Sequence, residues 1–203
     1  MNITKTTRQY INQHLFIKHC LTKRIINFSE LARQIITDTK LRKPDFNAIL
    51  VAARRYSDEL IKHRVSGQEA KICELLKKCK LKVNTKICRL IVRKGIELNY
   101  KNVLHSIHGE NAITIIAESE YYQELKSKYK HALLDKKNNL AELAIISPKD
   151  ADITQGFTSY LSSLLADKGI NILTTLGSYT DDIFIINRKD ISVALDVLNE
   201  VLI

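Results

Sequence analysis

The sequence predicts an α+β protein in which a basic, helical N-terminal region precedes small antiparallel sheets covered by helices. Residues 140–203 read as strand, helix, strand, strand, helix, with turn residues at each junction. Residues 1–80 contain 17 Lys and Arg against 7 Asp and Glu, whereas residues 81–203 contain 15 of each. At 203 residues the chain is long enough for separate domains, predicted at 1–80, 81–138 and 139–203.

The C-terminal region opens with an apolar strand, Leu140–Ile146, which ends at Pro148 because proline removes a ladder donor. A helix follows, and Gly169 ends it as a left-handed cap. Its apolar residues recur at helical spacing and predict one buried stripe; they are Phe157, Tyr160, Leu161, Leu164 and Leu165.

Two further strands, Ile170–Leu176 and Ile183–Ile186, are joined by the small polar stretch 177–182, whose composition predicts a hairpin. Asp190 caps a last helix, in which apolar residues again keep helical spacing. The order β-α-β-β-α is that of a ferredoxin-like unit, with two helices on one face of an antiparallel sheet.

The amino-acid sequence of this region resembles that of the ACT domain, a small amino-acid-sensing module attached to biosynthetic enzymes and some regulators. The resemblance lies in SSLLADKGINI (162–172), SYTDDIFII (178–186) and DISVAL (190–195). The family usually has Pro-Gly, or at least Gly, before its first helix; here Gly156 is kept without the proline. The whole chain also resembles archaeal proteins in which a helical N-terminal region precedes an ACT region. This resemblance implies no activity.

The ACT resemblance implies a ligand between the loop before the first helix and the start of the second strand. The matching positions are Gly156 and Asn171, and Asp152 or Thr154 would add an acceptor for an ammonium group. A helix N-terminus suits a carboxylate, and an asparagine amide both donates and accepts. Helix capping explains Asp152 and Thr154 equally well, and a turn role explains Asn171.

The middle of the chain looks like an incomplete copy of the same unit. Ile87–Arg93, Val103–Ile107 and Ala112–Ala117 are strand-like, and a helix is expected near 121–129. The segment Lys94–Lys101 is too short, and its composition of polar and apolar residues too mixed, to form the first helix of the unit. Because small sheets leave unpaired edges, we expect a homodimer or larger oligomer through the ACT-like strands.

Three helices are expected in the N-terminal region, at Ile3 to about His19, Ser29–Ile36 with Ser29 as N-cap, and Pro44 to about Lys62. In the third helix the apolar stripe predicts which residues lie nearer to solvent: Asn47, Val51, Arg54, Arg55 and Asp58.

This helix order suits a helix-turn-helix, and FSELARQI resembles the second helix of many winged-helix DNA-binding domains. Arg54 and Arg55 would then lie on the recognition helix. Lys40, Arg42 and Lys43 would contact phosphates. Asp58 and Glu59 on the same helix would repel a phosphate backbone, so a helical cap or dimerisation arm remains an alternative, as does a composition bias of the genome.

The sequence contains no recognisable catalytic motif, metal-binding motif or membrane-spanning segment. Cys20, Cys73, Cys79 and Cys88 form no C-x-x-C pair, and His105 and His108 would point to opposite faces of a strand, so no metal or cofactor is expected. Asp181 and Asp182 are interpreted as turn residues, and the protein is not expected to be an enzyme. A polar N-terminus without an apolar run predicts a cytoplasmic protein.

These observations favour a regulatory protein that senses a small molecule, most simply an amino acid, with transcriptional regulation as its output. Two alternatives stay open: a regulatory subunit that docks on a biosynthetic enzyme, and an oligomeric scaffold without a ligand.

Overall fold

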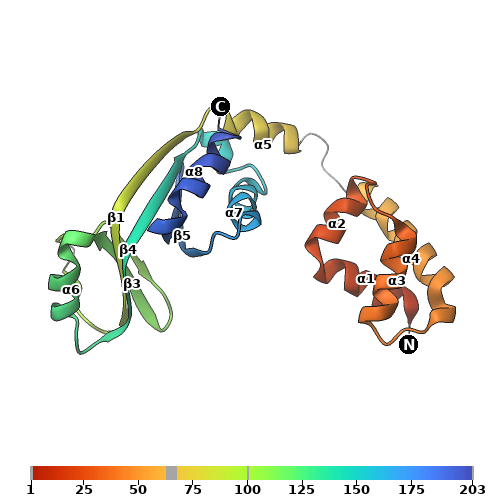
Figure 1. The fold of residues 1–203 in the computed structure, drawn as a ribbon, viewed down its shortest axis with the longest axis horizontal. Coiled ribbons are helices and arrows are strands. Elements are labelled where there is room, and N and C mark those ends of the chain that lie inside the picture. The colour runs from red at the N-terminus through yellow and green to blue at the C-terminus, as the bar shows by residue number, and fades with distance from the viewer. Residues whose placement is uncertain (1, 63–67, 100, 203) are drawn as a thin grey trace. The chain divides into compact units, whose positions relative to one another are not determined.

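The structure is a computed structural model that describes residues 2–62, 68–99 and 101–202. The chain divides into two compact units, residues 1–66 and 67–203 (Figure 1). The division lies before the boundary expected at residue 80. Helix α5 (Gln68–Leu76) belongs to the second unit, because its Ile72, Leu75 and Leu76 are buried in that unit's core.

The first unit is helical, with α1 (Ile3–Gln13), α2 (Leu15–Thr22), α3 (Phe28–Asp38), a short 3₁₀ turn η1 (Lys43–Asp45) and α4 (Phe46–Lys62). Helix α4 contacts each of the other three helices, and their apolar faces meet in one core. No strand occurs among residues 2–62, so the β-hairpin wing of a winged-helix domain is not found in them.

Two helix boundaries differ from those expected. The helix expected to continue from Ile3 to about His19 is interrupted at His14, whose backbone leaves the helical region (φ −114°, ψ 85°) while its ring hydrogen-bonds the Tyr10 carbonyl at 2.7 Å. Asn27, not Ser29, caps α3: its Oδ1 accepts from the Ser29 and Glu30 amides at 3.0 and 3.2 Å. An Asn at this position satisfies first-turn donors, which places Ser29 inside the helix.

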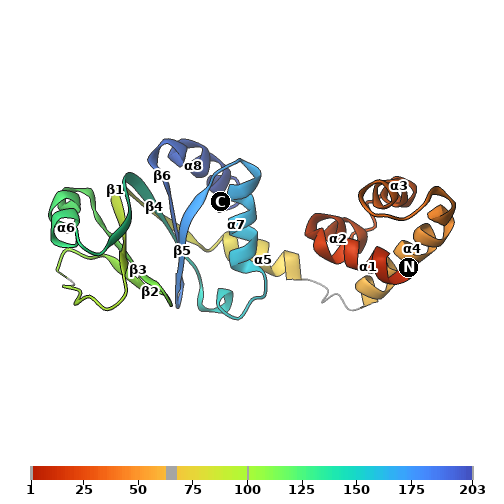
Figure 2. The ribbon, with the colours of Figure 1, turned by 90° about the horizontal axis from the view of Figure 1, so that it is seen from below.

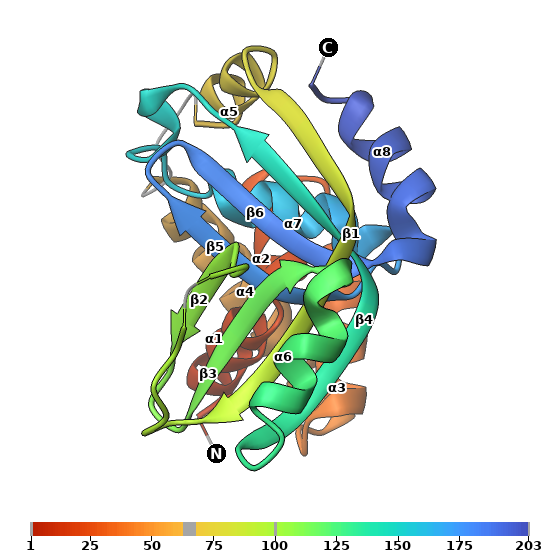
Figure 3. The ribbon, with the colours of Figure 1, turned by 90° about the vertical axis from the view of Figure 1, so that its left-hand side faces the viewer.

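The second unit is built on a six-stranded sheet in the order β2-β3-β1-β4-β6-β5, with all neighbours antiparallel (Figure 3). The strands are β1 (Lys80–Arg93), β2 (His105–His108), β3 (Ala112–Glu118), β4 (Leu133–Ile146), β5 (Ile172–Ser178) and β6 (Asp181–Asn187). The helices are α6 (Tyr122–Lys128), α7 (Phe157–Asp167) and α8 (Ile191–Asn199), in addition to α5. Short 3₁₀ turns precede α6, α7 and α8, the one before α7 being η3 (Lys149–Ala151).

Two long strands are shared between two ferredoxin-like halves. Strands β1 and β4 have 14 residues each. The end of β1 and the start of β4 pair within the first half, with β2, β3 and α6; the start of β1 and the end of β4 pair within the second half, with β5, β6, α7 and α8. The division expected between residues 138 and 139 therefore falls inside β4. Among residues 94–99 and 101–104 there is no helix, so the first half lacks the helix that α7 provides in the second.

Three apolar clusters hold this unit together. Helix α6 covers the first half, whereas α5, α7 and α8 pack over the second half (Figure 2). The third cluster lies on the opposite face of the sheet and joins both halves, because it contains Ile116 of β3 together with Ile183 and Ile185 of β6. In β6, Phe184 alternates with these two residues and faces the helices.

Polar contacts also join the halves. The almost buried Arg89 of β1 donates through Nη2 to Asp135 Oδ2 at 2.8 Å and through Nη1 to the Leu173 carbonyl at 2.9 Å. His105 Nε2 lies 2.8 Å from Glu142 Oε2, linking β2 to β4.

Replacing Asp135 with Ala is expected to lower the free energy of unfolding by about 1–2 kcal/mol at neutral pH, because it leaves the Arg89 charge without its carboxylate. The half-exposed position of Asp135 keeps the effect below that of a fully buried pair. Urea denaturation measures the difference, and the exposed Asp196→Ala, on α8, is the matched control, with a change expected within about 0.5 kcal/mol.

The contribution of Asp135 depends on pH. Partial burial raises the pKa of Asp135, but the hydrogen bonds from Arg89 and the Lys136 amide and the charges of Arg89 and Lys137 outweigh burial and lower the pKa. A carboxyl whose pKa is lower in the folded state stabilises the fold above its unfolded pKa of about 3.9. The difference between wild type and Asp135→Ala should therefore shrink as pH falls through the folded-state pKa. A difference that does not change with pH would contradict this origin.

Candidate ligand site

A cavity of about 360 Å³ opens in the second half of the sheet unit. Three segments line it: the loop after β4 (residues 147–154), the start of α7 (156–159) and the β5–β6 hairpin (177–182). Figure 3 shows the hairpin end of β5 and β6 beside the loop that precedes α7. A volume of this size holds a small metabolite.

One wall of the cavity is the N-terminus of α7. Gly156 is the N-cap residue with φ +83°, a left-handed conformation that glycine adopts without strain. A Cβ there would meet only Ile72 Cδ1, at 4.0 Å, so the backbone conformation, not space, favours glycine. Among the described residues no side chain caps this helix. The Thr158 and Ser159 amides, in the first turn, therefore lie at the positive end of the helix dipole, and both residues line the cavity.

The other wall is acidic. Asp182, at the start of β6, accepts a hydrogen bond from the Thr158 hydroxyl at 2.7 Å. Burial raises the pKa of Asp182, the Thr158 hydrogen bond lowers it, and the charges of Asp152 and Asp181 raise it further. The net effect is a raised pKa, which means that the surroundings disfavour the charged form of this carboxyl. A bound cation would stabilise that charged form.

Three of the four residues assigned to the ligand from the ACT resemblance line this cavity: Asp152, Thr154 and Gly156. Asp152 is exposed. Thr154 is almost fully buried and donates to the Asp150 carbonyl at 2.6 Å, so its hydroxyl proton is already used within the loop.

Asn171 lies elsewhere. It is exposed and comes just before β5, whereas the cavity is at the other end of that strand. The reason is geometric: α7 runs back along the sheet, so the start of β5 follows the C-terminal end of the helix, about 16 Å from its N-terminus. Within one chain, the structure does not bring Asn171 together with Gly156.

Thr158 and Asp182 were not among the predicted site residues. The hairpin composition favoured a turn role for Asp182, yet the structure places it in β6, paired with Ile145 of β4. Side chains alternate along a strand, so Asp182 lies on the same face as Phe184 and Ile186, the face that α7 covers. In the sequence, Asp182 comes two residues before the apolar Phe184. This spacing on a strand indicates that the carboxylate lies on the buried face of the sheet.

Two of the four cysteines, Cys79 and Cys88, are buried. Burial raises the pKa of Cys79, and it raises the pKa of Cys88 to about 11. No group of three or more His, Cys, Asp or Glu side chains positioned to hold a metal ion occurs among the described residues. None of the helices that these residues form combines the length and the hydrophobicity needed to cross a lipid bilayer.

The basic residues proposed for nucleic acid all lie in the first unit and are exposed. Lys40, Arg42 and Lys43 belong to the connection between α3 and α4. Arg54 and Arg55 lie on α4, where the Arg54 guanidinium sits 5.7 Å from the centre of the Phe28 ring.

A sequence model of the ACT domain family matches residues 136–200, the segment that contains the cavity. No curated protein matches the chain. Among solved structures, the aspartate kinase of Clostridium acetobutylicum, described as an allosteric enzyme, is similar over 61% of this chain at 12% identity, with a TM-score of 0.51. The similar region spans only 34% of that enzyme. At this identity the likeness shows a similar fold and nothing more.

Two further solved structures are similar. VC0802 of Vibrio cholerae, a protein of unknown function described as a possible transport protein, has 17% identity and a TM-score of 0.49, over 68% of this chain and all of that one. The ligand-free regulatory subunit of aspartate kinase from Thermus thermophilus has 14% identity and a TM-score of 0.48, over 60% of this chain and 95% of that one. Residues 136–200, which form most of the second half of the sheet unit, are therefore similar to an ACT domain.

Proposed function

We propose that this chain is a regulatory protein, not an enzyme, whose ACT-type module binds a free amino acid in the cavity beside α7. The observation that carries this proposal is that the N-terminus of α7 and the carboxylate of Asp182 line the same cavity, side by side. The amides at the start of α7 suit a carboxylate, and Asp182 suits an ammonium group. An α-amino acid presents both groups a few ångströms apart.

The charges that line the cavity argue against a purely anionic metabolite. Asp152, Asp181 and Asp182 all contribute to the lining, and none of the described lining residues is Lys or Arg. A phosphate or a dicarboxylate would meet these three carboxylates, whereas a zwitterion or a cationic amino acid would neutralise one of them.

A thermal-shift screen of the twenty amino acids on the full-length chain tests the proposal. An amino acid that binds the folded state alone raises the melting temperature by mass action. We expect at least one to do so, while succinate and phosphate do not. No shift with any amino acid at millimolar concentration would leave the oligomeric scaffold as the better description.

The ligand can regulate an output only by binding two arrangements of the protein with different affinity. The first unit supplies a candidate output: residues 1–66 contain 13 Lys and Arg against 5 Asp and Glu, a net charge of +8. This charge favours binding to nucleic acid and hence transcriptional regulation. Retention of genomic DNA fragments at low salt tests it. The competing role, docking on a biosynthetic enzyme, would instead give co-purification of that enzyme from native cells.

We expect the chain to form at least a homodimer through the sheet unit, in keeping with the oligomer predicted from its strands. In the described sheet, β2 and β5 are edge strands with one unpaired side each, and such an edge can pair with a strand of a second copy. Sedimentation velocity at micromolar concentration should give twice the chain mass of 23.2 kDa or more. A stable monomer there would contradict this expectation.

A further inference from the structure

The acidic residues of the first unit are all engaged within that unit, in hydrogen bonds or ion pairs. Glu30 pairs with Arg33 at 2.6 Å, Asp38 accepts from the Tyr10 hydroxyl at 2.6 Å, and Asp45 accepts from the Arg42 amide at 2.9 Å. Asp58 lies 3.8 Å from Arg24 and Glu59 lies 2.5 Å from Arg8. Asp58 and Glu59, which from the sequence would repel a phosphate backbone, each have an arginine partner.

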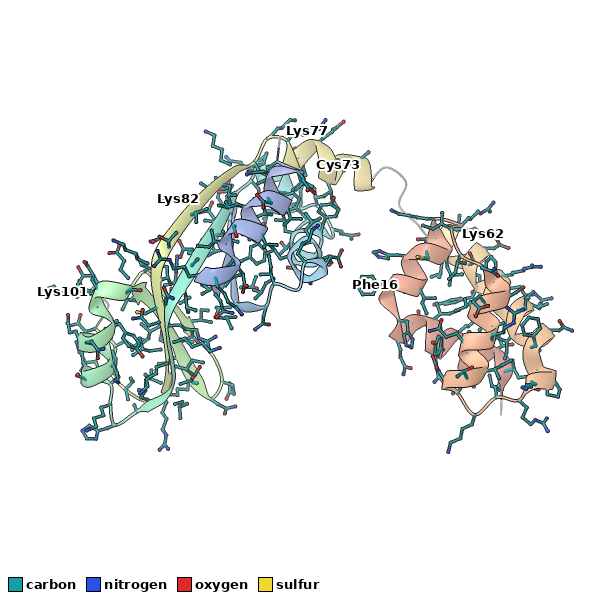
Figure 4. The ribbon with its side chains drawn as sticks, in the orientation of Figure 1. Phe16, Lys62, Cys73, Lys77, Lys82 and Lys101 are labelled. Atoms are coloured by element: carbon teal, nitrogen blue, oxygen red, sulfur yellow. The ribbon has the colours of Figure 1, made fainter. Side chains whose placement is uncertain are left out.

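Lys5 and Lys18 lie on α1 and α2, and a larger group of cations lies on α4 and on the connection before it. Among the described residues, no carboxylate lies within 4 Å of these side chains: Lys40, Lys43, Arg54, Arg55 and Lys62. Lys62 stands at the C-terminal end of α4 (Figure 4). Unpaired, exposed cations on one helix and its leading loop form the electrostatic footprint of a polyanion-binding surface.

The exposed face of α4 carries more than charge. Asn47, Val51, Arg54, Arg55 and Asp58, the last paired with Arg24, fall at helical spacing on one side, within about 100° around the axis. The opposite side is buried through Ile49, Ala52, Ala53 and Ser57, whose hydroxyl donates to the Leu21 carbonyl at 3.0 Å. Val51 is 45% exposed in the middle of this polar face. This apolar side chain is therefore accessible to a partner.

These side chains match the chemistry of a B-form major groove, which accepts one α-helix. An asparagine amide pairs with both hydrogen-bonding groups of adenine, an aliphatic side chain contacts the thymine methyl group, and arginine binds guanine or phosphate. Asn47 and Val51 occupy the N-terminal half of α4, the half that a recognition helix inserts. The major groove of A-form RNA is too narrow for such a helix, so duplex DNA is the partner.

We infer that α4 is a DNA-reading helix, in which Asn47 and Val51 contact base edges while Lys40, Arg42, Lys43, Arg54 and Arg55 hold the flanking phosphates. This inference rests on the proposed binding of nucleic acid by the first unit, and it adds that the binding discriminates between sequences. Phosphate contacts position a protein on DNA, whereas groove contacts give it a sequence preference.

Selection from a pool of duplexes with a randomised central segment, using the full-length chain at about 100 mM salt, tests the inference. Wild type should enrich one sequence. Asn47→Ala and Val51→Ala should each change the enriched sequence at one or two positions, weaken binding to the wild-type sequence about tenfold and leave binding to an unrelated duplex unchanged. Arg54→Ala with Arg55→Ala should weaken binding to every duplex and flatten its salt dependence.

The matched control for the arginine pair is Lys168→Ala with Lys189→Ala, which removes the same charge from exposed positions of the second unit and should leave DNA affinity unchanged. Circular dichroism melts confirm that each variant is folded. If no sequence is enriched, or if the Asn47 and Val51 variants enrich the wild-type sequence, base reading is overturned while charge-driven binding stands. If no duplex is retained even at about 50 mM salt, the nucleic-acid function itself fails. Retention of RNA or single strands alone overturns duplex reading.

Discussion

Phe184→Ala is expected to lower the free energy of unfolding of the sheet unit by about 3–5 kcal/mol. Phe184 is fully buried in β6, between its partners Leu143 of β4 and Thr175 of β5, and it packs against the core beneath α7 and α8. The loss combines the transfer free energy of the ring with the cavity that it leaves. Because domains are stable by only about 5–15 kcal/mol, this change removes a large share.

Urea denaturation followed by circular dichroism measures this loss. Tyr179→Ala is the matched control, since this aromatic residue lies in the same hairpin but is 67% exposed, and its removal should cost less than about 0.5 kcal/mol. The transition of residues 1–66 should not move, because no residue of that unit belongs to the core around Phe184. A loss below about 1 kcal/mol, or equal destabilisation of both units, would contradict the packing described here.

Asp182→Asn is expected to have opposite effects on ligand affinity and on stability. The substitution removes the negative charge proposed to bind the ammonium group, and a hydrogen bond to a charged group contributes about 1.5–3 kcal/mol, or roughly 10–100-fold in affinity. Isothermal titration with the amino acid that gives the largest thermal shift measures this loss. Affinity of the wild type should also fall as pH is lowered through the raised pKa of Asp182, because the protonated carboxyl no longer attracts a cation.

The same substitution should stabilise the protein without ligand at neutral pH. Burial raises the pKa of Asp182 in the folded state, so the stability associated with the neutral carboxyl is present below the unfolded pKa of about 3.9 and is lost as pH rises through the folded pKa. Asparagine stays neutral and still accepts from the Thr158 hydroxyl. The stabilisation relative to wild type should therefore vanish in acid.

Asn171→Ala separates this site from the position first suggested by the ACT resemblance. Asn171 is exposed and outside the cavity, so its removal should leave both affinity and stability unchanged. If Asn171→Ala abolishes the thermal shift and Asp182→Asn does not, the ligand lies at the far end of β5, not beside the start of α7.

The sequence by itself determined most of the local structure. The order of elements from residue 140 onward, the glycine before α7, the missing helix after β1 and the exposed face of α4 were all predictable. Each depends on side-chain periodicity or on the conformational preference of a few neighbouring residues. These properties are local and do not depend on tertiary contacts. The helix starts were less certain: Asn27 and Ser29 are both good caps, and only the folded backbone selects one.

Only the tertiary structure decided how these elements combine. That β1 and β4 each serve two halves follows from pairing between residues far apart in the chain, as when Leu81 meets Ile145 and Val92 meets Leu133. Helix α5 belongs to the sheet because its apolar face is buried there. Asp182 reaches the cavity because β6 carries it under α7, and Asp58 and Glu59 are paired because Arg24 and Arg8 reach them. Such contacts depend on chain topology and burial, which local patterns do not specify.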